Sequence, residues 1–80
     1  MKITLLFFGV TADLIGKTVL VMALENTMTV GALKLVLKEK YLKLKNMDAY
    51  AVAVNEAYAE GTLILKEGDV VAIIPPVSGG

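Results

Sequence analysis

The chain has 80 residues, which allows one domain, and its eight lysines balance eight acidic residues to give a formal net charge of zero. The balanced charge provides no overall field that would attract nucleic acid or an acidic membrane, so we expect neither as a partner. The absence of histidine and cysteine removes the usual metal ligands, the usual base at neutral pH and any thiol nucleophile. We therefore expect no bound metal, no bound cofactor and no catalytic side chains in this chain.

The first apolar segment, residues 3–10, predicts a strand in which Ile3, Leu5 and Phe7 face the core. The same segment resembles a short secretory signal, because Lys2 precedes the apolar run and small residues follow it. A strand is the favoured interpretation, since removing this segment would delete a full apolar strand from an already small core.

The next elements are a short turn of helix and a second strand. Gly9 ends the first strand, and Thr11 is predicted to cap a single helical turn over residues 12–15. Residues 18–24 are rich in β-branched and long apolar side chains, which favours a strand. The connection between the two strands suits antiparallel neighbours.

A helix is predicted to begin at Thr29, which has the side chain of an N-cap residue. Met28 and Leu33 have the spacing of a hydrophobic staple. An apolar stripe with helical spacing follows and consists of Leu33, Val36, Leu37, Tyr41 and Leu44. Leu35 and Leu42 fall outside this stripe, so either they are exposed or the helix ends near Tyr41.

Two further strands are predicted at residues 50–54 and 70–74, and turn signals bracket a possible third at residues 63–65. The predicted fold class is therefore α+β, a mixed sheet of four to five strands with one main helix packed on one face. One helix cannot cover both faces, so the other face should be partly open. Hydrophobic residues make up 56% of the chain, and we expect some of them to form a partner surface and to favour self-association where that partner is missing.

The domain is predicted to span residues 1–74, followed by an extended tail over residues 75–80. Pro75 and Pro76 cannot donate backbone hydrogen bonds, so they should end the sheet and direct the tail outward. Gly79 and Gly80 have no Cβ and can enter a slot too narrow for other residues. We expect Gly80 to be the reactive residue, although a frayed terminus would have the same composition.

This order of elements resembles the small subunit of molybdopterin synthase, MoaD, a family of ubiquitin-like β-grasp proteins. The resemblance covers the whole chain and is carried by Leu6-Phe7-Phe8-Gly9, Leu14-Ile15-Gly16, Thr29-Val30 with Leu33, Val54-Asn55-Glu56, Glu67-Gly68-Asp69-Val70 and the segment from Ile73 to Gly80. The family often has an Arg-Glu pair where this chain has Ala12-Asp13, so this chain lacks any salt bridge that such an arginine would make.

The resemblance implies a sulfur carrier in the cytoplasm and a non-catalytic subunit of a transferase. An adenylating enzyme related to MoeB would use ATP to activate the Gly80 carboxylate, and a sulfur donor would convert the acyl adenylate to a thiocarboxylate. The tail, made of Pro75, Pro76, Val77, Ser78, Gly79 and Gly80, would then enter a large subunit related to MoaE. There it would donate sulfur to cyclic pyranopterin monophosphate to form the molybdopterin dithiolene.

Docking in the family uses the open sheet face, which the resemblance carries over to Phe8, Tyr58 and Ile74. Ordinary core packing is the alternative for each of these side chains. Three other functions stay open: a ThiS-like sulfur carrier for another pathway, a ubiquitin-like modifier of proteins, and an interaction module whose tail is inert.

Overall fold

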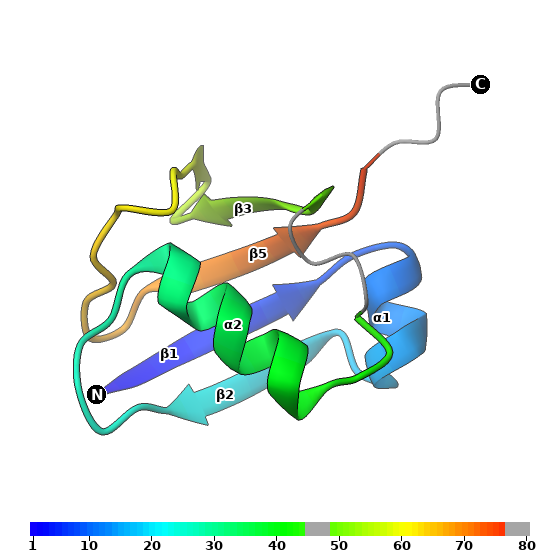
Figure 1. Ribbon diagram of the computed structural model, residues 1–80, viewed down its shortest axis with the longest axis horizontal. Coiled ribbons are helices and arrows are strands. Elements are labelled where there is room, and N and C mark those ends of the chain that lie inside the picture. Colours follow the sequence, from blue (N-terminus) through cyan, green and yellow to red (C-terminus); the bar gives the residue numbers. More distant parts are fainter. Residues whose placement is uncertain (45–48, 77–80) are drawn as a thin grey trace.

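The computed structural model describes residues 1–44 and 49–76 of the protein. Its elements, in chain order, are β1 (Lys2–Phe7), α1 (Val10–Ile15), β2 (Val19–Ala23), α2 (Val30–Lys40), β3 (Ala51–Val54), β4 (Ala57–Tyr58) and β5 (Val70–Ile74). The five strands form one sheet in the order β2-β1-β5-β3-β4. The central strands β1 and β5 are parallel, and the other neighbours are antiparallel. Helix α2 lies across one face of this sheet (Figure 1), which confirms the predicted α+β architecture.

The core lies between the sheet and α2. Side chains alternate along β1, so Ile3, Leu5 and Phe7 are almost fully buried, as predicted. Leu33 and Leu37 of α2 belong to the same hydrophobic cluster. Each fully buried side chain of this size stabilises the fold by about 1.5–3 kcal/mol. This buried layer therefore holds α2 against the sheet.

Helix α2 begins where the sequence predicts. The Thr29 hydroxyl oxygen accepts a hydrogen bond from the Ala32 amide at 3.1 Å, and Met28 packs against the core. The helix ends at Lys40, next to the expected end at Tyr41. Leu35 and Leu42, which fall outside the apolar stripe, are both exposed.

The predicted cap at Thr11 is wrong. Helix α1 begins at Val10, and Gly9 is its N-cap residue with φ 56° and ψ −133°. Thr11 lies inside the helix, fully buried, and its hydroxyl donates a hydrogen bond to the Phe8 carbonyl oxygen. The helix starts earlier than predicted because Gly9, with its positive φ, occupies the N-cap position. Gly16 ends the helix in the left-handed region, as glycine does at many helix C-termini.

The possible strand at residues 63–65 does not form beyond an isolated bridge between Thr29 and Ile64. The fifth strand is β4, which follows β3 through a tight turn at Asn55 and Glu56, both with positive φ. This geometry matches the hairpin turns that favour asparagine. The returning strand β4 has only two residues, which are too few to show any alternation in the sequence.

Candidate functional site

The sheet face opposite α2, here called the open face, carries a continuous apolar row. Strand register aligns one residue from each of the five strands, in the order Val19, Leu6, Ala72, Ala53 and Tyr58. Register partners direct their side chains to the same face of a sheet. The row therefore crosses the whole sheet without a charged residue.

A second row lies beside the first and consists of Val21, Thr4 and Val70. Val19 and Val21 are 52% and 62% exposed, and Tyr58 is 79% exposed. Between these two edge strands, Leu6 and Ala72 are partly buried and Ala53 is 8% exposed. Exposed apolar side chains of this kind are frequent in protein-binding sites. The open face therefore exposes apolar side chains mainly along its two edge strands.

The three residues predicted to contact a partner all belong to this side of the sheet or its edge. Phe8 is 49% exposed, and its amide donates to the Ile73 carbonyl oxygen at 3.4 Å, which continues the parallel ladder beyond β1. Phe8 therefore sits beside Ile74, which is partly buried. Core packing does not account for Phe8 or Tyr58, and their role in docking stays a prediction.

The tail leaves the sheet at this same end. Pro75 follows β5 directly and packs against Gly9, where an added Cβ would lie 3.2 Å from the Pro75 Cγ atom. Pro75 is partly buried and Pro76 is exposed. The exit of the tail is thus held by a contact with the β1–α1 turn, which sequence reasoning missed because it treated Gly9 only as the end of a strand.

The remaining residues of the predicted tail lie outside the described residues. They are Val77, Ser78, Gly79 and Gly80. The reactive position itself therefore stays a prediction, and the structure places only the two prolines that lead to it.

Two of the sequence motifs that carry the family resemblance meet in space. The Asp69 carboxylate accepts hydrogen bonds from the Asn55 side-chain amide at 3.0 Å and from the Lys66 amide at 2.8 Å. The Asn55 side-chain oxygen accepts from the Val70 amide at 3.0 Å. These bonds tie the β3–β4 turn to the start of β5, so the two motifs have a structural role.

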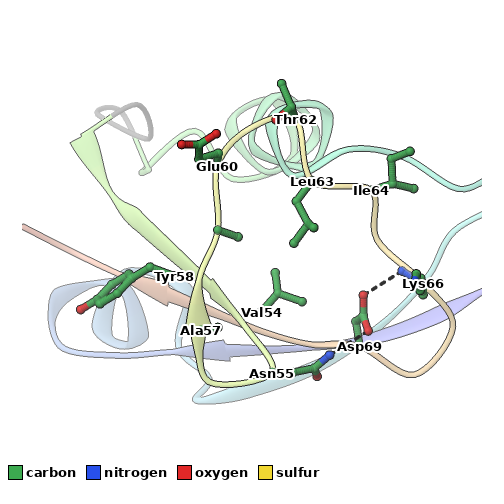
Figure 2. Close-up of a pocket in the computed structure, with 11 residues that line it drawn as sticks. Val54, Asn55, Ala57, Tyr58, Glu60, Thr62, Leu63, Ile64, Lys66 and Asp69 are labelled. Carbon is green, nitrogen blue, oxygen red and sulfur yellow. Dashed lines mark hydrogen bonds between the residues drawn. The ribbon is translucent and has the colours of Figure 1, made fainter.

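A shallow groove of about 520 Å³ lies above this cluster. Figure 2 shows Val54 and Leu63 directed into the groove, while the Tyr58 ring points away from it. The polar groups at its base, Asn55 and Asp69, already satisfy one another. Val54 and Leu63 therefore give the groove apolar walls, and the polar groups at its base are already hydrogen-bonded.

The described ranges, 1–44 and 49–76, contain no cluster of three or more histidine, cysteine, aspartate or glutamate side chains able to hold a metal ion. Within the same part of the chain, no helix has the length and apolar character needed to cross a membrane.

A mixed five-stranded sheet with one main helix on one face is the architecture of the β-grasp, the fold of ubiquitin-like proteins. The chain belongs to the ThiS family, whose model matches residues 5–80. The predicted β-grasp fold and the predicted resemblance to ubiquitin-like sulfur carriers are confirmed. The family model has the name of ThiS, which the sequence left open as an alternative to MoaD.

Solved structures resemble the chain over nearly its whole length. A candidate molybdopterin converting factor subunit 1 from Pyrococcus furiosus is 28% identical, with a TM-score of 0.85 over 96% of this chain and 99% of the other. Subunit 1 of the molybdopterin-converting factor from Helicobacter pylori, solved in complex with subunit 2, is 29% identical with a TM-score of 0.70 over all of both chains. SAMP1 from Haloferax volcanii has a TM-score of 0.84 over all of both chains at 24% identity, which shows a shared fold.

Proposed function

We propose that this protein is the sulfur-carrier subunit of a molybdopterin synthase. One observation carries the proposal: the apolar row of the open face includes Leu6 and Ala72, each three residues before Gly9 and Pro75, whose contact marks the exit of the tail. A partner seated on the open face would therefore receive the tail as well. The likeness to two molybdopterin converting factor subunits at 28% and 29% identity supports this pathway.

Gly80 is the residue whose carboxyl group carries the sulfur in this proposal. A carboxylate is ionised near neutral pH and is a poor electrophile. An adenylating enzyme related to MoeB activates it with ATP, and a sulfur donor replaces the adenylate to leave a thiocarboxylate. The sulfur then acts as a nucleophile toward cyclic pyranopterin monophosphate. All catalytic groups come from partners, which fits a chain that lacks histidine and cysteine.

The partner that covers the open face is a large subunit related to MoaE. Tyr58 ends the apolar row, Phe8 and Ile74 lie two residues beyond its members Leu6 and Ala72, and all three would contact the large subunit. Aromatic side chains are frequent hot spots in such interfaces. The restricted φ of Pro75 and Pro76 would direct the tail toward the large subunit. The small volume of Gly79 would let the tail enter a narrow channel there.

The test is the mass of the C-terminal peptide combined with genetic complementation. Incubation with ATP, an adenylating enzyme and a sulfur donor should replace one carboxyl oxygen by sulfur at Gly80. The gene should restore molybdenum-cofactor synthesis in a strain that lacks the small subunit. Oxygen-for-sulfur exchange without this rescue would leave a sulfur carrier but reject the molybdopterin pathway.

A second candidate is a carrier for thiazole synthesis, which the match to the ThiS family model favours. Rescue of a thiamine auxotroph, and not of a molybdenum-cofactor-deficient strain, would establish this second function. A protein modifier would instead form covalent ladders on target proteins that disappear when Gly80 is deleted.

A further inference from the structure

We propose that two copies of this chain pair through the free edge of β2 to form a symmetric dimer. Strand β2 is one end of the sheet, so one of its sides has no neighbouring strand among residues 1–44 and 49–76. In Figure 1 it forms the lower border of the sheet, away from the exit of the tail. This inference is independent of the proposed sulfur-carrier role.

The hydrogen-bonding pattern of β1 and β2 identifies which residues face the free edge. Met1 and Leu24 exchange both backbone hydrogen bonds, and the Phe7 amide donates to the Thr18 carbonyl oxygen. In an antiparallel pair, hydrogen-bonded and non-hydrogen-bonded positions alternate. Leu20 and Met22 therefore bond to β1. The backbone groups of the residues between and beside them, namely Val19, Val21 and Ala23, point outward.

This edge has none of the features that normally prevent pairing. Natural edge strands are protected by lysine, proline, bulges or very short length. Residues 18–24 include no charged residue and no proline, and β2 is five residues long. The opposite edge strand, β4, has only two residues. Val19 and Val21, both exposed, flank the free backbone groups with apolar side chains.

The occupant that fits this edge is a second copy of the same strand. If a two-fold axis passes through Val21, then Val21 pairs with Val21 of the second copy, and Val19 pairs with its Ala23. All of these positions have outward backbone groups, so each pair can exchange both of its hydrogen bonds. The same register places Lys17 opposite Glu25 of the second copy at both ends of the pair.

This charge match selects one register. Lys17 and Glu25 are both exposed and lie just beyond the two ends of the β1–β2 ladder. A shift to the next hydrogen-bonding register in either direction separates them. Opposite charges directly across an antiparallel pair are stabilising, and like charges are destabilising. In this register, outward backbone groups meet outward backbone groups, apolar side chains meet apolar side chains, and Lys17 meets Glu25 of the second copy.

Charge exchange provides the test, with sedimentation equilibrium of the full chain over a concentration series. The unmodified chain should dimerise. Lys17→Glu and Glu25→Lys each place like charges opposite one another at both ends, and each should weaken the dimer about ten-fold or more. The double variant restores opposite charges in swapped positions and should dimerise like the original.

Mixing the two single variants sharpens the test. One variant then has glutamates at both positions and the other has lysines, so equal amounts should form a heterodimer although each alone is mainly monomeric. The matched control is a mixture of Lys38→Glu and Glu60→Lys, which makes the same change in net charge at exposed positions away from β2. This control mixture should show no preference for heterodimers.

Amide hydrogen exchange supplies a second measurement. Dimerisation should protect the outward amides of Val19, Val21 and Ala23, while Leu20 and Met22 are protected at every concentration. A chain that stays monomeric throughout the series would overturn the proposal. A dimer that ignores the charge variants but is lost in Leu6→Glu would also overturn it and would assign self-association to the open face.

Discussion

Gly9 and Pro75 lie in contact at the point where the tail leaves the sheet, with only 3.2 Å between an ideal Cβ on Gly9 and the Pro75 Cγ atom. Gly9 also has φ 56° and ψ −133°, a backbone conformation that residues with a side chain rarely adopt. One glycine thus shapes the turn into α1 and leaves the space in which Pro75 packs.

Replacing Gly9 by alanine should therefore lower the free energy of unfolding by about 2–3 kcal/mol, from backbone strain and from the clash with Pro75. Denaturant unfolding measures this loss. Gly16→Ala is the matched control, because Gly16 also has positive φ but has open space around it, and it should lose only about 1 kcal/mol.

A double-mutant cycle separates the clash from the strain. In a Pro75→Ala background, Gly9→Ala should cost about 0.5–1 kcal/mol less than in the original chain, because the opposing ring is gone. Equal costs in the two backgrounds would mean that the contact with Pro75 contributes nothing to this end of the sheet.

A second prediction concerns the cluster that joins the β3–β4 turn to β5. Asp69→Ala removes the acceptor of both the Asn55 side chain and the Lys66 amide, so it should destabilise the fold by about 1–3 kcal/mol. Glu60→Ala changes an exposed carboxylate in the adjacent loop and should have little effect in the same unfolding experiment. Similar stabilities for the two variants would contradict the structural role assigned to Asp69.

Local patterns in the sequence predict the central elements well. Alternation in β1 identifies Ile3, Leu5 and Phe7 as core residues, and the continuous apolar run of β5 gives its bounds of Val70–Ile74. Thr29 caps α2 as expected. These features succeed because the local preference and the tertiary packing agree.

The features that sequence reasoning missed depend on contacts between distant segments. The alignment of Val19, Leu6, Ala72, Ala53 and Tyr58 into one row follows from strand register, which no single segment encodes. Strand β4 has only two residues, and its pairing with β3 depends on the turn at Asn55 and Glu56. Thr11 has the side chain of a cap residue, but the N-cap position of α1 is occupied by Gly9, two residues earlier.

The open face provides a third prediction, on binding of the large subunit. Tyr58→Ala removes an exposed aromatic side chain at the end of the apolar row and should weaken binding of a MoaE-like subunit about ten-fold or more. Stability should hardly change, since Tyr58 is 79% exposed. Titration calorimetry measures the affinity.

The matched control for this prediction is Leu35→Ala. Leu35 is also a large exposed apolar residue, 61% accessible, but it belongs to α2 on the other side of the sheet. Its removal should leave the affinity unchanged. A stronger effect from Leu35→Ala than from Tyr58→Ala would place the partner on the helical face.

The fourth prediction separates the proposed chemistry from the fold. Deletion of Gly80 should abolish formation of the thiocarboxylate and complementation, because activation requires the carboxyl group of that glycine in the proposed mechanism. Addition of one residue after Gly80 should be equally damaging. Neither change affects the buried layer formed by Ile3, Leu5, Leu33 and Leu37, so the free energy of unfolding should be unaltered.

Mass spectrometry and denaturant unfolding of the same preparations test both the loss of the thiocarboxylate and the unaltered free energy of unfolding. Activity retained without Gly80 would reject the sulfur-carrier mechanism, whereas a parallel loss of stability would show that the tail supports the fold instead.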